Sequence, residues 1–151
     1  MYVEDWSPDS KRLLCRDATG GRVMVVPATG GPPRPIHTSP YFTVDLRLSP
    51  DEKFVAYTSV ETGREEIEIA SYPSFADKRP VSTEGGTYPT WRKDGKELFF
   101  RAESGKLMSA EIENAGGLKI GAPKPVFRVT GLSVPPYGYA PTGDGKRFLI
   151  I

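Results

Sequence analysis

The single histidine and the single cysteine are the side chains of this sequence best suited to acid–base or nucleophilic chemistry. A Ser-His-Asp enzyme needs a base aligned with its nucleophile. His37, however, stands in a proline-bounded stretch, and no Gly-x-Ser-x-Gly motif is present. Cys15 follows Leu13-Leu14, a setting in which a free cysteine packs as a small apolar side chain. We therefore expect both residues to be structural.

Phosphate and metal chemistry are equally poorly supported by the motifs. Kinase chemistry requires a glycine-rich loop and a His-Arg-Asp loop, and neither is present. The Gly-Gly pairs precede no helix-forming segment, so they indicate turns. Only Glu61 with Glu65-Glu66 approaches the ligand spacing of a calcium loop. The sequence predicts no catalytic residues, no cofactor and no metal ion, and hence a chain without enzymatic activity of its own.

The composition excludes several broad classes. About one residue in five is glycine or proline (16 and 15 of 151), which argues against a helical bundle. Twenty Lys and Arg against nineteen Asp and Glu give no general electrostatic reason to bind nucleic acid or an anionic membrane. Apolar runs are far shorter than the roughly 20 residues of a membrane span. The first residues resemble no signal peptide, so the compartment stays open.

The elements that must position these residues form a repeat. Four similar segments are aligned on Asp9, Asp51, Asp94 and Asp144, at steps of roughly 40 to 50 residues that are typical of a propeller blade with four strands. Each segment contains a turn related to Ser-Pro-Asp-Gly, with Ser-Pro in the first two copies and glycine in the last two, followed by a short apolar strand. Ser10 and Glu52 replace the glycine, so those two turns are strained or of another type.

The rest of each unit completes a four-stranded antiparallel blade. A glycine-bearing turn leads to a third strand, and a more polar fourth strand contains proline, which is tolerated at an outer edge. Trp6 and Trp91 share one repeat position, which favours packing between blades. We predict an all-β chain, a β-propeller or partial propeller of about three and a half repeats. The expected blades are 1–39, 40–83 and 84–130, with a partial blade at 137–151 after a long loop.

Trp-Ser-Pro-Asp followed by a short apolar strand resembles the TolB-type, WD-like propeller repeat. The stretch from Val81 to Phe100, with Gly105-Lys106-Leu107-Met108 and the ending Gly145 to Ile150, is similar to the C-terminal propeller of bacterial membrane-linked serine/threonine kinases and related transcriptional regulators. That resemblance implies an extracytoplasmic sensor or interaction module. It also implies six or more blades, so the chain is either part of a larger ring or completes itself by self-association through open blade edges.

The predicted function is binding of a protein, peptide or small ligand, as a non-enzymatic module of a larger signalling protein. The alternative is an accessory or gating propeller of a prolyl-oligopeptidase-like peptidase. The candidate binding residues lie near the starts of the inner strands, where loops surround the channel mouth: Asp45, Arg47, Tyr88, Tyr137 and Tyr139.

Overall fold

A computed structural model describes residues 1–128 and 138–150. Blade 1 contains β1 (Tyr2–Trp6), β2 (Arg12–Arg16), β3 (Arg22–Pro27) and β4 (Arg34–Thr38). Blade 2 contains β5 (Thr43–Leu48), β6 (Phe54–Ser59), β7 (Glu66–Ser71) and β8 (Arg79–Pro80). Blade 3 contains β9 (Thr87–Trp91), β10 (Glu97–Arg101), β11 (Lys106–Glu113), β12 (Lys119–Ile120) and β13 (Lys124–Arg128). A two-stranded fourth unit contains β14 (Tyr139–Pro141) and β15 (Phe148–Ile150).

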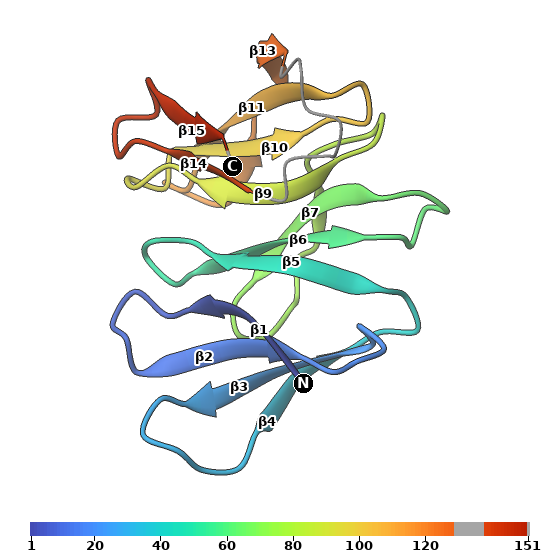
Figure 1. Cartoon of the computed structure of the whole chain (residues 1–151), viewed down its shortest axis with the longest axis vertical. Helices are drawn as coiled ribbons and strands as arrows, with labels where there is room; N and C mark the ends of the chain where they lie inside the picture. The colour runs from blue at the N-terminus through green and yellow to red at the C-terminus, as the bar shows by residue number, and fades with distance from the viewer. Residues whose placement is uncertain (129–137, 151) are drawn as a thin grey trace.

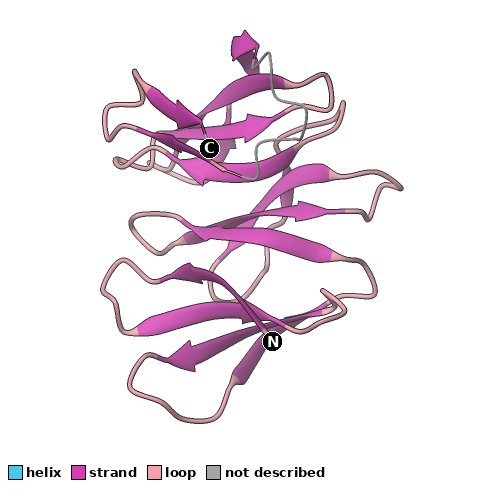
Figure 2. Ribbon diagram, in the orientation of Figure 1, coloured by secondary structure: helices cyan, strands magenta, loops and turns pink. Residues whose placement is uncertain are grey.

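The sheets are antiparallel and stacked in chain order (Figure 1). The first strand of each blade is innermost, because β1 contacts β5 and β5 contacts β9 across the blades. Figure 2 shows strands and loops but no helix in the described part of the chain. The predicted all-β fold with four-stranded antiparallel sheets is confirmed. Blade 3 differs by the short β12, which pairs with the far end of the long β11.

Two apolar cores join the blades. The core between blades 1 and 2 consists of side chains from their facing surfaces: Leu14, Val23, Leu46, Leu48, Val55, Tyr57, Ala70 and Phe75. The core between blades 2 and 3 is made in the same way by Ala56, Ile67, Ile69, Val81, Trp91, Leu98, Phe100, Ala110, Ile112 and Leu118. Phe148 of β15 packs edge-on against Phe99 and Phe127, with ring centroids 5.0 and 5.3 Å apart. Each sheet is therefore held by apolar contact with its neighbour.

The four turns that contain the repeated aspartate adopt one conformation, whichever residue follows the aspartate. Ser10, Glu52, Gly95 and Gly145 all have φ between 56° and 72°. Each donates its backbone N–H to the carbonyl three residues earlier, at 2.7 to 2.9 Å. The two turns without glycine are therefore not of another type; they hold an ordinary L-residue in the left-handed region, at a cost of about 1 kcal/mol.

The two equivalent tryptophans have different surroundings. Trp91 is 9% exposed and belongs to the core against blade 2, whereas Trp6 is 53% exposed. By the repeat, Trp6 lies on the face of blade 1 that is turned away from blade 2. The prediction of packing between blades is confirmed for Trp91, and no described blade covers Trp6.

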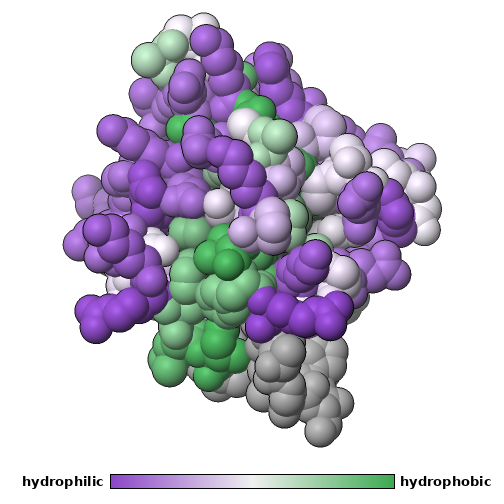
Figure 3. Space-filling model, turned by 90° about the horizontal axis from the view of Figure 1, so that it is seen from above, coloured by the Kyte–Doolittle hydropathy of each residue, from purple (hydrophilic) through white to green (hydrophobic). Residues whose placement is uncertain are grey.

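Apolar side chains are also exposed at the opposite end of the stack. Figure 3 looks onto that end and shows an apolar area among hydrophilic surface. The exposed apolar side chains on its strands are Val126, Phe127 and Leu149. The first and last sheets of the stack thus both leave apolar surface uncovered by the described residues.

Candidate ligand-binding site

The inner strands of blades 2 and 3 each contain a bulge near their start. The register of β5 on β6 shifts between Val44 and Arg47, and a shift in the pairing of β9 with β10 lies at the same repeat position. The bulged residues Asp45 and Tyr88 have φ of 54° and 56°. A positive φ in a non-glycine residue is uncommon and often marks a functional site. Both bulges lie at the end of the stack where the inner strands begin.

Four of the five predicted binding residues come together at this end. An oxygen of Asp45 accepts a hydrogen bond from the Thr58 hydroxyl at 2.9 Å and lies 3.4 Å from the backbone nitrogen of Tyr88. The Tyr139 hydroxyl donates to the carbonyl oxygen of Tyr88 at 2.7 Å. Tyr137 lies outside the described residues. The binding role of these residues stays a prediction.

Much of this hydrogen bonding joins one blade to the next. Arg47 donates through Nη1 to the carbonyl of Glu4 in blade 1, and its own carbonyl accepts the indole N–H of Trp91 at 3.0 Å. Tyr139 is partly buried, and this burial raises the pKa of its hydroxyl well above the ordinary value, so it stays protonated as a donor. Arg47 and Tyr139 therefore hold the inner strands in place at the mouth.

A residue at or next to the end of the second strand lies near each bulge, including the corresponding bulge of β1 between Val3 and Asp5, and the sequence did not mark it. In blade 1 this residue is Arg16, whose Nε lies 2.6 Å from a carboxylate oxygen of Glu4. In blade 2 it is Thr58, which binds Asp45. In blade 3 it is Arg101. The repeat alignment contains the signal, since these three residues follow the turn aspartates at equal distance.

Arg101 differs from its two counterparts because blade 3 supplies no carboxylate to it. Pro89 occupies the position that Glu4 has in blade 1, and Tyr88 stands at the bulge of blade 3. The guanidinium carbon of Arg101 lies 5.9 Å from the centre of the Tyr88 ring. Its Nη1 is buried and has no hydrogen-bond partner. An unsatisfied buried donor of a charged group is costly, and such a group is suited to bind an anion.

A polar pocket of about 260 Å³ lies beside Arg101, between blades 2 and 3. Loop residues of both blades line it: Arg64, Glu65, Gly85, Gly86, Thr87, Arg101 and Glu103. Arg64 is already paired with the buried Glu66 at 2.7 Å. Glu65 and Glu103 supply carboxylates to the pocket, but Nη1 of Arg101 has no hydrogen-bond partner among the described residues. A bidentate carboxylate is the group that fits a guanidinium best.

The two residues first considered for catalysis have ordinary surroundings. Cys15 is fully buried, and burial raises the pKa of its thiol, which disfavours the reactive thiolate. His37 lies on the edge strand β4 and stacks on Phe75 with ring centroids 4.4 Å apart. Burial lowers the pKa of His37, so its imidazole is neutral near pH 7. Within the described ranges, no group of three His, Cys, Asp or Glu residues is placed to hold a metal ion.

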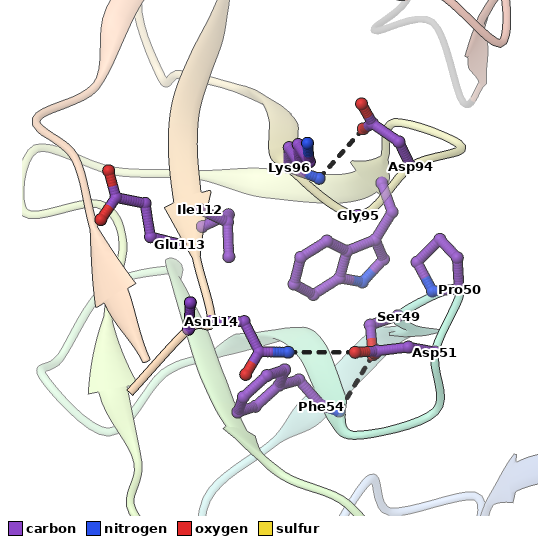
Figure 4. A pocket seen from close by; sticks show the side chains of 12 residues that line it. Ser49, Pro50, Asp51, Phe54, Asp94, Gly95, Lys96, Ile112, Glu113 and Asn114 are labelled. Atoms are coloured by element: carbon purple, nitrogen blue, oxygen red, sulfur yellow. Dashed lines mark hydrogen bonds between the residues drawn. The ribbon is translucent and has the colours of Figure 1, made fainter. Parts of the chain in front are cut away.

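A larger pocket of about 580 Å³ lies at the other end of the same two blades (Figure 4). Blade 2 contributes the turn Ser49-Pro50-Asp51 and Phe54, and blade 3 contributes Trp91, its turn, and the end of β11. Asn114 donates to a carboxylate oxygen of Asp51 at 3.0 Å and so bridges the two blades. Its size is in the range of small-molecule sites. No sequence motif marked it.

Comparison with known proteins identifies the fold. No protein-family model matches the sequence, and no curated protein matches it. A solved structure assigned as TolB from Agrobacterium tumefaciens is 20% identical, with a TM-score of 0.65 over 96% of this chain and 51% of that one. A periplasmic gluconolactonase from Pseudomonas aeruginosa is 19% identical, with a TM-score of 0.63 over 98% and 46%. An oligogalacturonate lyase in complex with manganese is 15% identical, with a TM-score of 0.65 over 98% and 43%.

These similarities show a propeller-type fold, and the chain spans about half the length of the three proteins. The TolB-like part of the predicted resemblance is confirmed at the level of fold. The finer resemblance to kinase propellers is not shown by these similarities. In the described part of the chain, no helix has the length and apolar character needed to cross a membrane.

The prediction of a chain without enzymatic activity is contradicted by these comparisons. A lactonase and a lyase share its fold. The sequence lacks the motifs of a serine triad, a kinase and a calcium loop, but acid–base catalysis by carboxylates or other positioned groups requires none of these. The missing motifs therefore do not exclude catalysis on this fold.

Proposed function

We propose that this chain is a ligand-binding part of a β-propeller and that its ligand presents a carboxylate to the end where the inner strands begin. Arg101 binds the carboxylate in this proposal. Tyr88 flanks the guanidinium, while Asp45, Arg47 and Tyr139 keep the inner strands in register around the mouth. The ligand is a protein, a peptide or a small molecule, since all three classes can present a carboxylate.

The unpartnered Arg101 nitrogen is the observation that carries this proposal. The same repeat position is matched with an inner-strand carboxylate in blades 1 and 2, by Arg16 with Glu4 and by Thr58 with Asp45. In blade 3 a pocket open to solvent lies beside the arginine. A ligand carboxylate would supply the partner that the repeat lacks there.

The sequence resemblance supports a wider context for this binding end. We propose that the chain belongs to a larger signalling protein, as in the membrane-linked kinases it resembles, and that it lies outside the cytoplasm. A periplasmic protein among the solved structures of the same fold supports that location. The alternative, a gating propeller of a peptidase, is supported by the repeat alone and requires a hydrolase domain elsewhere in the parent protein.

Calorimetric titration with citrate, which presents three carboxylates, tests the proposal. The unaltered chain should bind citrate, and Arg101→Gln should weaken binding at least about tenfold, as expected for loss of a charge-assisted contact. Arg79→Gln removes an exposed positive charge on β8 and serves as the matched control. Equal weakening by both substitutions would show that only net charge matters, and no binding by the unaltered chain would refute the proposal.

We also propose that the chain self-associates through its uncovered end faces. Exposed Trp6 at one end and Leu149 at the other support this, since apolar surface of this kind favours association. Head-to-tail pairing would place Trp6 against a neighbouring sheet, as Trp91 is placed against blade 2. Sedimentation velocity should show a dimer that Trp6→Glu dissociates; a monomer at all concentrations would contradict the proposal.

A further inference from the structure

The pocket between the turns of blades 2 and 3 has an aromatic wall. Trp91 and Phe54 line it together with Ile112. Figure 4 shows Phe54 and Asp51 on one side of this space and Lys96 on the other, with Ile112 between them, whereas the carboxylates of Asp94 and Glu113 point outward. Trp91 retains 9% of its surface exposed. The pocket thus combines aromatic surface with charged groups at its rim, and it lies at the opposite end of the inner strands from Arg101.

The repeat explains why this pocket is open. At the corresponding place between blades 1 and 2, Arg12 of β2 and Glu52 of the next turn form an ion pair at 2.5 Å. In the junction between blades 2 and 3, Phe54 stands at the Arg12 position and Gly95 at the Glu52 position. A Cβ atom at Gly95 would make only an ordinary contact with Pro50, at 3.6 Å. The junction between blades 1 and 2 is bridged by this ion pair. The junction between blades 2 and 3 has the ring of Phe54 in place of the arginine and no side chain in place of the glutamate.

The ionised groups in the pocket wall are mostly acidic. Asp51, Asp94 and Glu113 line it, against the single ammonium of Lys96. Arg92 holds the pKa of Asp94 at about 2, so this carboxylate is ionised across the ordinary pH range. Each carboxylate has a basic neighbour: Arg92 pairs with Asp94 at 2.8 Å, Lys53 lies 3.9 Å from Asp51, and Lys119 lies 4.0 Å from Glu113. Arg92, Lys53 and Lys119 are not among the lining residues.

We infer that this pocket binds a cationic group, an ammonium or a guanidinium, against the faces of Trp91 and Phe54. Aromatic rings attract cations through their quadrupole, most strongly for tryptophan, and nearby carboxylates add to the attraction. The cation belongs either to a free small molecule, such as a quaternary amine, or to a lysine or arginine side chain of a peptide. This site is independent of Arg101, so its test and that of the proposed function can fail separately.

Binding is measured by the shift of the Trp91 indole N–H signal in a two-dimensional NMR titration, with the Trp6 signal as an internal reference. Choline is the first probe, and its neutral isostere 3,3-dimethylbutan-1-ol is the comparison. Glycyl-arginyl-glycine is the peptide probe. We expect saturable shifts of Trp91 alone and affinity for choline at least about fivefold above that for the isostere, consistent with a partly desolvated cation–π contact. Whichever of choline and glycyl-arginyl-glycine binds more tightly shows whether the cation belongs to a small molecule or to a peptide.

The double variant Phe54→Arg with Gly95→Glu transplants the ion pair from the junction between blades 1 and 2. It should close the pocket and weaken choline binding at least about tenfold. The second variant, Asp51→Asn with Glu113→Gln, keeps the shape and should weaken binding about threefold or more. Asp9→Asn is its matched control, because Asp9 accepts the same turn hydrogen bonds in blade 1 as Asp51 does in blade 2.

Three results would overturn the inference. They are the absence of a saturable Trp91 shift up to about 100 mM choline, equal affinity for choline and its isostere, and unchanged choline binding in a folded double variant. Should the double variant fail to fold, the Asp51 and Glu113 variant decides, since unchanged binding there removes the electrostatic basis of the site.

Discussion

Blades 1 and 3 are two copies of one repeat, and their equivalent residues have opposite surroundings. Trp6 is exposed where Trp91 is buried, and Arg16 is paired with Glu4 where Arg101 has an unpartnered nitrogen. The strands and turns are nevertheless alike. The comparison shows that the repeat conserves the backbone geometry, while each position's role is set by the neighbouring blade.

The largest difference is expected at the two tryptophans. Trp91→Ala removes a buried ring and its hydrogen bond to Arg47, and should lower the free energy of unfolding by about 3–5 kcal/mol. Trp6→Ala should change it by less than about 1 kcal/mol in the monomer, because its ring is half exposed. Urea denaturation at low protein concentration measures both. Equal losses would show that Trp6 is buried in solution.

The two arginines should differ by a smaller amount. Arg16→Gln leaves the largely buried Glu4 carboxylate without its charged partner and should cost about 1–3 kcal/mol. Arg101→Gln removes an unsatisfied buried donor and should lie within about 1 kcal/mol of the unaltered chain. The same denaturation series compares them. A loss at Arg101 as large as that at Arg16 would mean that Arg101 has a structural partner.

The turn residues test the backbone part of the comparison. Ser10→Gly should stabilise the chain by about 0.5–1 kcal/mol, and Gly95→Ser should destabilise it by about 1 kcal/mol, since φ is positive at both positions. A side chain at Gly95 meets no close contact, so the backbone conformation is what is measured. A loss of stability in Ser10→Gly would contradict a common turn conformation.

The smallest expected effect concerns the turn carboxylate of blade 3. Hydrogen bonds from Arg92 and from the backbone of Lys96 lower the pKa of Asp94 to about 2 from 3.8. Its folded-state pKa is lowered, so its contribution to stability is present above pH 3.8 and is lost as pH falls through 2. Asp94→Asn should therefore be slightly less stable than the unaltered chain near pH 7, and the two should converge toward pH 2. A difference that is constant with pH would contradict this origin.

The sequence was sufficient for the fold and insufficient for the site. The turn aspartates and short apolar strands predict the antiparallel sheets because each turn and strand depends on local residues. The repeat alignment places Arg101 at the same position as Arg16 and Thr58. Its missing hydrogen-bond partner depends on the bulge at Tyr88, which the sequence does not show. Likewise, Trp6 and Trp91 occupy the same repeat position, but the repeat does not show whether a neighbouring sheet covers each ring.

Side-chain NMR during an acetate titration tests the carboxylate site most directly. The Nε–Hε signals of Arg16 and Arg101 are followed in one sample, so the blade 1 arginine controls for ionic strength and pH. We predict that Arg101 shifts saturably while Arg16, already bound to Glu4, does not. Equal shifts of both signals, or no shift of Arg101, would contradict the account.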